Sequence, residues 1–495
     1  YDLTFRFHFL ILYKIMTTTK KITTTPSFLF RSSDPTWNNT NDKIVVEKKK
    51  RIKKRFRLFR RKSSKSDSET VIDEGEENYL NCENTTGAAA CFEATTENNK
   101  NNIWKRDKTQ KVVVYNQFSD DPKAVLEVGA DADIPKPTDE DDVVVKVQAS
   151  TVSYNDCALR RGMCLSITNP VCLPATPGMD FVGNIVSVGT KVQQEEKWNK
   201  GDRVAVLIRT GGNARYVVVP QSSLVEVPRS LDSAEAACIV STYMTAYQSI
   251  KSYLVDHKTV SLVEKKILII GATGATGHAL IQMARQAGST EVYATAPNKL
   301  HRYVESVLGA KPLPMESWLS SVVGKMDLVL DSVCEDGFDS AQKALSPTGS
   351  LICIGMTGLY NNDTMGAFGA PLMAHWNMAK AEYFMSQTKF YDVWTSFNTS
   401  PKVFKSDLEH LFLLLRKRDI KPHVAKRVCL SEVSEAHVYL ELGEARGAVV
   451  CLPWKRSPLV IGGVRAGEYG EDLHKEISGV YCSEKITGIG FCVCL

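Results

Sequence analysis

Residues 266–296 carry the most regular hydrophobic pattern of the chain. An apolar run at 267–270 predicts a short strand that is buried on both faces. Glycines follow at intervals of three, and apolar residues then recur at helical spacing up to Ala287, where Gly288 predicts the end of a helix. Residues 291–295 predict the next strand. Such a strand, glycine turn, helix and strand can bring backbone N–H groups and a helix N-terminus to a pyrophosphate.

The flanking segments follow two other patterns. Short β-type runs between glycines and prolines predict a compact β-rich unit, with strands at 111–115, 143–148, 184–188, 203–208 and 215–219. From about residue 237 the pattern alternates between strands and helices. Strands are predicted there at 327–331 and 350–355. Residues 403–454 return to the style of the first unit, with a helix ended by Pro422 and a strand at 447–452.

Composition narrows the class of protein. With 495 residues the chain is long enough for two globular units plus tails, and 43% hydrophobic and 24% charged residues are ordinary for a soluble protein. No apolar run is long enough to span a membrane. The 13 cysteines form no CxxC pair. This pattern argues against a disulfide framework or a zinc knot and fits a reducing compartment.

The net charge of +5 comes from one segment. Residues 48–62 hold 11 basic residues and no acid, so the rest of the chain is mildly acidic. Ile52, Phe56 and Phe59 fall at helical spacing within this segment. One interpretation is a basic amphipathic helix that contacts anionic lipid or nucleic acid. The other is a solvated run of charge.

Residues 1–108 are predicted to be an arm outside the folded domains. Residues 16–33, which begin at the first methionine, contain Thr, Ser, Lys and Arg but no acid. This is the composition of an organelle transit peptide or of a plain disordered terminus. Residues 67–102 are acidic and rich in Asn and Thr, which predicts a disordered linker. We expect order to begin near Lys111.

A series of motifs occurs in a distinctive order. They are VSYNDCALRRG (152–162), PGMDFVGNIVSVGTKV (177–192), KGDRV (200–204), GGNARYVVVP (211–220), STYMTAYQSI (241–250), GATGATGHALIQMAR (271–285), DLVLDSV (327–333), LSPTGSLICIG (345–355) and the segment 419–450. The series resembles the medium-chain dehydrogenase/reductase superfamily over residues 110–454. It is most similar to the zinc-independent branch of quinone oxidoreductases and enoyl reductases.

The resemblance implies an α/β fold class. A GroES-like β-rich catalytic domain and a Rossmann domain with a doubly wound parallel sheet would enclose a substrate cleft. The expected segments are a disordered or targeting arm (1–108), the catalytic domain (109–236), the Rossmann NADP-binding domain (237–375), a return to the catalytic domain (376–455) and a tail (456–495).

Three residues depart from the zinc-dependent members of this superfamily. The positions of the catalytic zinc ligands hold Ser153, Met179 and Ser241. Hydroxyls and a thioether are poor Zn²⁺ ligands beside thiolate and imidazole. The structural zinc lobe is also missing, because no cysteine lies between Cys172 and Cys238. We therefore predict no metal site.

The resemblance also implies candidate site residues. Tyr154 and Asn155 would lie beside the nicotinamide and the substrate, where a phenol can donate a proton and an amide can hold an oxygen or the ribose. A buried Tyr154 that only shapes the pocket is the alternative. Asp156 is expected to brace its loop through backbone N–H groups. The candidate cofactor-binding residues are Thr245, Gly274, Ala275, Thr276, Gly277, Thr295, Asn298, Lys299, His301, Arg302, Ser332 and Gly355. Ala275 stands where zinc-independent members usually have a second glycine.

The loop after the second strand of the glycine unit predicts NADP(H) as cofactor. Units selective for NAD place an acid at the end of this strand, where it accepts from the ribose hydroxyls. Here residues 294–302 contain no acid. Lys299 and Arg302 can instead reach a 2′-phosphate with charged donors. Two solvated surface cations are the alternative.

The expected function is a zinc-independent, NADPH-dependent oxidoreductase that transfers hydride to a quinone or an α,β-unsaturated carbonyl or enoyl substrate. One alternative is a non-enzymatic binding protein that uses 48–62 on nucleic acid or membrane. A zinc-type alcohol dehydrogenase is another. The expected partner is a small carbonyl compound or quinone, and a homodimer stays open. The expected location is cytoplasmic, or mitochondrial or plastid if 16–33 is a transit peptide.

Overall fold

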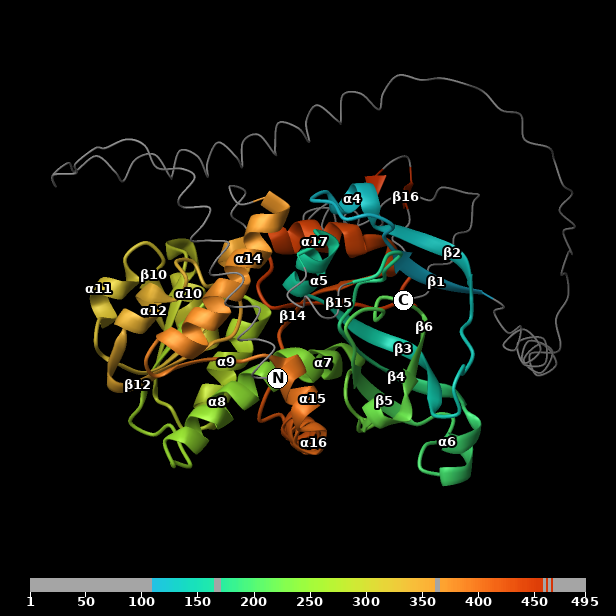
Figure 1. Cartoon of the computed structure of the whole chain (residues 1–495), viewed down its shortest axis with the longest axis horizontal. Coiled ribbons are helices and arrows are strands. Elements are labelled where there is room, and N and C mark those ends of the chain that lie inside the picture. Colours follow the sequence, from blue (N-terminus) through green and yellow to red (C-terminus); the bar gives the residue numbers. More distant parts are fainter. Residues whose placement is uncertain (1–108, 164–170, 361–365, 457–459, 462–463, 466–495) are drawn as a thin grey trace, which may run out of the picture. The chain divides into compact units, whose positions relative to one another are not determined.

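The computed structural model describes residues 109–163, 171–360, 366–456, 460–461 and 464–465 (Figure 1). The predictions for the arm 1–108, including its segments 16–33, 48–62 and 67–102, lie outside the described residues, as does most of the tail. In the described part of the chain, no helix combines the length and the apolar character needed to cross a membrane.

Residues 266–390 supply a parallel sheet of six strands within the described ranges, in the order β10-β9-β8-β11-β12-β13. The strands are β8 (Lys266–Ile270), β9 (Glu291–Ala296), β10 (Lys311–Pro314), β11 (Met326–Asp331), β12 (Leu345–Cys353) and β13 (Thr388–Phe390). The chain enters at the centre, moves outward to β10 and crosses back to β11, which pairs with β8. This reversal is the topological switch point of a doubly wound sheet, where ligands bind at the carboxyl ends of the strands. Strand β13 lies beyond residue 375, where the Rossmann domain was predicted to end. The parallel sheet therefore extends past the predicted boundary.

A second, mainly antiparallel sheet combines two distant parts of the chain. Its order is β14-β15-β3-β4-β5-β7, and β6 also pairs with β3. The strands are β3 (Asp142–Val152), β4 (Asp180–Val188), β5 (Arg203–Leu207), β6 (Tyr216–Pro220), β7 (Val225–Glu226), β14 (Val424–Val428) and β15 (Ala448–Cys451). In Figure 1 the red β15 lies beside the cyan β3, with Val449 opposite Val152. Residues after the parallel sheet therefore return to the first unit, as the sequence predicts.

Smaller pairs and helices complete the described structure. The pairs are β1 (Thr109–Val114) with β2 (Glu127–Asp133), and β16 (Val460–Ile461) with β17 (Val464–Arg465). The helices are α4 (Pro122–Val125), α5 (Tyr154–Arg160), α6 (Thr190–Glu195), α7 (Ser233–Cys238), α8 (Met244–Asp256), α9 (Ala275–Gln286), α10 (His301–Tyr303), α11 (Trp318–Val322), α12 (Asp339–Lys343), α13 (Thr357–Tyr360), α14 (Gly366–Ala379), α15 (Val393–Thr399), α16 (Pro401–Lys417) and α17 (Val433–Glu441).

Helix α16 ends earlier than the sequence predicts. It stops at Lys417, before Pro422, because Arg418 adopts a left-handed conformation with φ of 63°. The Arg418 N–H then donates to the carbonyls of Leu414 and Leu415, which satisfies the helix end without the proline. The prediction that Pro422 ends the helix was therefore wrong.

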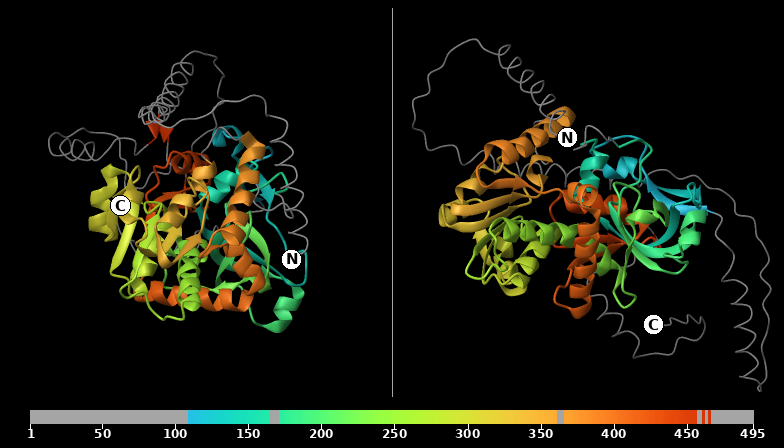
Figure 2. Two further views of the ribbon diagram at one scale, coloured as in Figure 1. Left: turned by 60° about the vertical axis from the view of Figure 1, so that its left-hand side comes forward. Right: turned by 60° about the horizontal axis from the view of Figure 1, so that its bottom comes forward.

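One buried apolar cluster joins the two sheets. It includes Val182 and Ala205 of the antiparallel sheet and Ile267 of the parallel sheet. The crossover between the sheets runs through α7, a π-helical turn at Ile239–Tyr243 and α8 without a break. Helix α8 packs against α9 and α16, and Figure 2 shows the red-orange α16 near the yellow-green helices from two further sides. Shared burial of this kind fixes the two halves of the candidate site relative to each other.

A buried ion cluster ties α5 to α17. Arg160 is fully buried, pairs with Glu441 and donates to the carbonyl oxygen of Ser119. Arg161 Nε lies 3.1 Å from the same Glu441 carboxylate. Burial raises the pKa of Glu441, and the two guanidinium groups oppose this rise. The cluster holds in place the helix that carries Tyr154 and Asn155.

Replacing Arg160 is expected to destabilise the protein strongly. The Arg160→Met variant leaves Glu441 with one cation fewer in a buried setting, which costs about 3–5 kcal/mol. Urea unfolding should show this loss, whereas Arg416→Met on the exposed face of α16 should stay within about 0.5 kcal/mol of the wild type. Equal unfolding midpoints for the two variants would show that the ion cluster does not hold α5.

Candidate functional site

The glycine turn lies at the carboxyl end of β8, at the switch point. Gly271 has φ of 91°, and a Cβ there would lie 2.6 Å from Ser332 Oγ. A Cβ on Gly277 would lie 2.3 Å from the carbonyl oxygen of Gly271. Both positions therefore require glycine. A Cβ on Gly274 would meet nothing nearer than 3.9 Å, so the space beside Gly274 is open.

Helix α9 presents a bare N-terminus beside that space. Gly274 is its N-cap, and no side chain among the described residues caps its first turn. The first N–H groups of a helix have no partner within it and carry about half a positive charge. The predicted Ala275 and Thr276 occupy the first two helical positions. The methyl of Ala275 packs against the apolar cluster between the sheets, which accommodates this departure from the family pattern. The geometry fits a pyrophosphate.

Residues from neighbouring strands brace the turn. Thr295 at the end of β9 is buried, and its Oγ1 accepts from the Gly271 N–H at 3.1 Å. Ser332 Oγ donates to the Ile270 carbonyl at 3.0 Å, and a Cβ on Gly355 would lie 2.7 Å from the Ser332 carbonyl oxygen. The structure therefore brings together the predicted Thr295, Ser332 and Gly355 around Gly271. Thr295 orients the turn through its hydroxyl.

A buried carboxylate fixes the loop that carries Ser332. Asp331 Oδ1 accepts from the backbone N–H groups of Val333 at 2.7 Å and Cys334 at 3.0 Å. Burial raises the pKa of Asp331 to about 6, although these hydrogen bonds lower it. The carboxylate still ionises at neutral pH and holds the loop against the end of β8.

The segment after β9 carries two exposed cations, on a 3₁₀ turn at Asn298–Leu300 and at the start of α10. Asn298, Lys299 and Arg302 are exposed, and His301 Nε2 lies 3.1 Å from the Ala296 carbonyl oxygen. Across the described ranges, neither Lys299 nor Arg302 takes part in an ion pair. This loop is therefore positively charged. The remaining candidate, Thr245, is partly buried in the first turn of α8.

Tyr154 and Asn155 begin helix α5. Ser153 is the N-cap, and Asp156 Oδ2 accepts from the Ser153 N–H at 2.7 Å in a reciprocal capping box. Asp156 Oδ1 accepts from the Gly178 N–H at 2.8 Å. The predicted bracing role of Asp156 is confirmed.

Tyr154, at the start of α5 after β3 of the antiparallel sheet, packs against the parallel sheet. It packs against an apolar cluster that includes Ile270 at the end of β8 and Met356 next to Gly355. Burial raises the pKa of Tyr154 more than the nearby Arg161 guanidinium lowers it. The phenol is therefore protonated at neutral pH and can act as a donor. Asn155 is exposed beside it.

The residues at the positions of the family's zinc ligands have other roles in the structure. Ser153 caps α5, and Ser241 Oγ donates to Asp180. Asp180 also accepts from the Thr151 N–H and hydroxyl at 3.0 and 2.7 Å, and its burial raises its pKa to about 6. Met179 is buried. Among the residues with described positions, no group of three or more His, Cys, Asp or Glu side chains is arranged to hold a metal ion.

The return segment touches the glycine turn, a contact that the sequence pattern does not reveal. The Gly447 N–H donates to the Thr273 carbonyl at 3.2 Å. Arg446 is the residue that precedes Gly447 in this contact. Gln282 of α9 donates to the Lys421 carbonyl at 2.9 Å and accepts from its N–H at 2.8 Å. The antiparallel domain therefore meets the turn and its helix directly.

Two histidine rings lie beside the same contact, His278 buried and His423 exposed. His278 Nε2 lies 3.4 Å from the Tyr303 hydroxyl, and the His278 and His423 ring centres are 5.3 Å apart. Burial, assisted by the neighbouring His423, lowers the pKa of His278 to about 4. The buried His278 ring is therefore a packing group at this interface, whereas His423 is exposed. Nothing in the spacing of the histidines along the sequence points to their meeting.

Comparison with known proteins covers both sheets. Residues 139–229 match the alcohol dehydrogenase GroES-like domain, and residues 308–451 match a zinc-binding dehydrogenase domain. Human quinone oxidoreductase is 25% identical over 338 residues, which are 66% of this chain and 94% of that protein.

Two solved structures share the fold. A mycobacterial protein complexed with NADPH is 22% identical with a TM-score of 0.56, over 70% of this chain and 100% of that one. The CurK enoyl reductase is 20% identical with a TM-score of 0.55, over 70% of this chain and 99% of that one.

Zinc is expected to be absent from the purified protein, because Ser153, Met179 and Ser241 replace its ligands. Elemental analysis should find well below one zinc per chain, and a chelator should leave turnover unchanged. A zinc-dependent alcohol dehydrogenase measured in parallel controls for metal loss during purification. One tightly held zinc per chain whose removal abolishes turnover would contradict this prediction.

Proposed function

We propose, on the premise that the chain belongs to the medium-chain dehydrogenase/reductase superfamily and is an oxidoreductase with a nicotinamide cofactor, that it is a zinc-independent reductase. It uses NADPH to reduce a quinone or an α,β-unsaturated carbonyl compound. The observation that supports this most is the uncapped N-terminus of α9 together with the acid-free segment 294–302, whose two exposed cations form no ion pair with any described residue. The alternative of a binding protein rests on 48–62, outside the described residues.

The residues at the switch point would hold the cofactor in a defined way. The first N–H groups of α9 would bind the pyrophosphate, with Gly274 leaving room for its approach. Ser332 and Gly355, at the ends of β11 and β12, would lie toward the nicotinamide end. When bound, the reduced nicotinamide supplies a hydride.

The polar groups of the chain favour a conjugated acceptor. Hydride addition to a carbon conjugated with a carbonyl moves negative charge onto the carbonyl oxygen. Tyr154, protonated at neutral pH, would donate a hydrogen bond to that oxygen, and the exposed Asn155 amide would orient the substrate or the ribose. Direct oxidation of an alcohol is harder here, because Ser153, Met179 and Ser241 are poor ligands for the Lewis acid that lowers the pKa of an alcohol.

The loop after β9 favours NADPH over NADH. A 2′-phosphate there would meet the exposed Lys299 and Arg302 and no carboxylate from residues 294–302. The Arg302 guanidinium can form two parallel hydrogen bonds to a phosphate, whereas Lys299 adds a point charge. Each charged hydrogen bond contributes about 1.5–3 kcal/mol.

Removing both cations should reduce the preference for NADPH. For Lys299→Ala with Arg302→Ala, we expect kcat/KM with NADPH to fall about tenfold or more for each lost hydrogen bond, and that with NADH to change little. The matched control replaces Lys343 and Arg416, which are exposed elsewhere. Equal kcat/KM for the two cofactors in the wild type, or a ratio that the double variant leaves unmoved, would show that this loop does not select the phosphate.

Turnover with a panel of acceptors tests the function itself. We expect NADPH oxidation with at least one quinone, enal or enoyl thioester. With that acceptor, Tyr154→Phe should lower kcat by about 10² or more while the KM for NADPH stays near the wild-type value. Tyr439→Phe, a partly buried tyrosine on α17, is the control. A protein that binds NADPH and reduces none of the acceptors would favour the binding-protein alternative. Unchanged kcat in Tyr154→Phe would leave Tyr154 as a residue that only shapes the pocket.

A further inference from the structure

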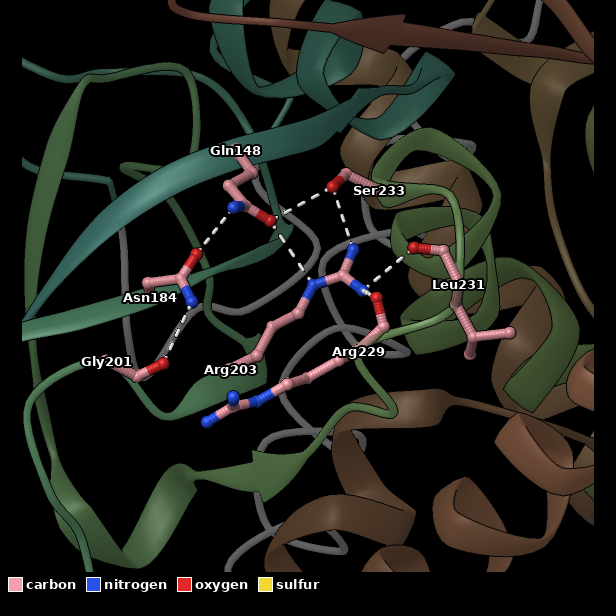
Figure 3. Close-up of a pocket in the computed structure, with 7 residues that line it drawn as sticks. All are labelled: Gln148, Asn184, Gly201, Arg203, Arg229, Leu231 and Ser233. Carbon is pink, nitrogen blue, oxygen red and sulfur yellow. Dashed lines mark hydrogen bonds between the residues drawn. The ribbon is translucent and has the colours of Figure 1, made fainter.

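A pocket lies in the antiparallel domain, apart from the residues assigned to the cofactor or to catalysis. Its volume is about 510 Å³, within the range of small-molecule sites. Figure 3 shows its lining, which is Gln148, Asn184, Gly201, Arg203, Arg229, Leu231 and Ser233. The lining comes from β3, β4, β5 with the turn before it, the loop that leads into α7 and the first residue of α7. It contains two guanidinium groups and no carboxylate.

Arg203 is a buried cation whose hydrogen-bond partners are all neutral. It is 7% exposed, and Nη1 donates to the carbonyl oxygens of Pro228 and Leu231 at 2.9 and 2.8 Å. Nε and Nη2 donate to Gln148 Oε1 at 3.2 Å and Ser233 Oγ at 2.8 Å. Within the described ranges Arg203 forms no ion pair, and burial lowers its pKa. An arginine that stays charged under these conditions favours a nearby anion.

The carboxylate that acts on Arg203 through space is already engaged. Asp232 raises the pKa of Arg203 through space, but it pairs with Arg427 at 3.0 Å. It also accepts from the N–H groups of Ala234 and Glu235 at the start of α7. The positive charge of the pocket therefore has no dedicated counter-ion among the described side chains.

The spare hydrogen-bonding capacity of the pocket consists mainly of donors. The Gln148 side-chain oxygen accepts from both Arg203 and Ser233, and the Asn184 oxygen accepts from the Gln148 amide. The Asn184 amide donates one N–H to the Gly201 carbonyl at 3.1 Å. Each amide keeps a second N–H, and the exposed Arg229 guanidinium has no side-chain partner in the described structure. Such a set is suited to an oxygen-rich acceptor.

We propose that this pocket binds a small anionic molecule through a carboxylate or phosphate group. Arg229 supplies a charged fork at the open side, and Arg203 supplies a fixed positive charge at the base. The Gln148 and Asn184 amides add neutral donors. This binding is independent of the proposed reduction, because none of the lining residues belongs to the cofactor turn or to the Tyr154 helix.

Isothermal titration of the full-length protein tests the proposal with inorganic phosphate and succinate as probes. We expect saturable binding of at least one probe, and the tighter one identifies the group that the pocket prefers. Tetramethylammonium chloride at matched ionic strength is the control for general salt effects. Arg229→Gln should weaken binding at least tenfold, Arg229→Lys should weaken it less, and Arg416→Gln on α16 should leave it unchanged.

A second variant tests the proposal independently of Arg229. Gln148→Glu places a carboxylate beside Arg203 and supplies the missing counter-ion within the protein. It should abolish binding of both probes and raise the Tm. NADPH turnover in Arg229→Gln should equal that of the wild type. Absence of saturable binding in the wild type, or equal binding by the wild type, Arg229→Gln and Gln148→Glu, would overturn the proposal.

Discussion

The close approach of the backbone to itself at the switch point is the constraint on which the candidate site depends. The start of α9 passes so near the end of β8 that a Cβ on Gly277 would lie 2.3 Å from the Gly271 carbonyl oxygen. Only this approach brings the bare helix N-terminus up to the carboxyl ends of β8 and β11. The hydroxyls of Thr295 and Ser332 hold the same few atoms from both sides. A side chain in the turn would move the helix away from the place proposed for a pyrophosphate.

The rest of the site depends on how the second sheet is joined to that turn. The return segment closes the antiparallel sheet through β15 and contacts the turn through Gly447. Gln282 joins α9 to the same segment at Lys421. The Arg160–Glu441 cluster then fixes α5, so that Tyr154 packs near the ends of β8 and β12. The residues proposed to face the substrate and the cofactor thus come from sheets that are held together by backbone contacts and one shared core.

The sequence predicted the parts of this arrangement that depend on residues close together in the chain. The glycine spacing predicted the turn, because few other residues allow a helix to start against a strand. Asp156 was predicted to brace its loop, because aspartate side chains in turns accept from backbone N–H groups. The Rossmann and GroES-like sheets followed from the resemblance.

What the sequence missed depends on contacts between distant segments. The end of α16 at Lys417 depends on the left-handed Arg418, which no residue type announces. His278 and His423 meet only after the return segment folds back. The pocket around Arg203 combines β3, β4, β5 and a loop, and in the sequence Arg203 is simply part of a family motif. The arrangement of these side chains is set by tertiary packing, which single-sequence periodicity does not describe.

The central claim is that hydride is added to the carbon β to the carbonyl of a conjugated acceptor, and that no metal ion binds the carbonyl oxygen. The most direct measurement follows a deuterium label from the nicotinamide C4 of NADPH into an enal that the enzyme turns over. The account predicts a saturated aldehyde with the label on the carbon β to the carbonyl. Label on the carbonyl carbon of an allylic alcohol, the outcome of alcohol dehydrogenase chemistry, would contradict it.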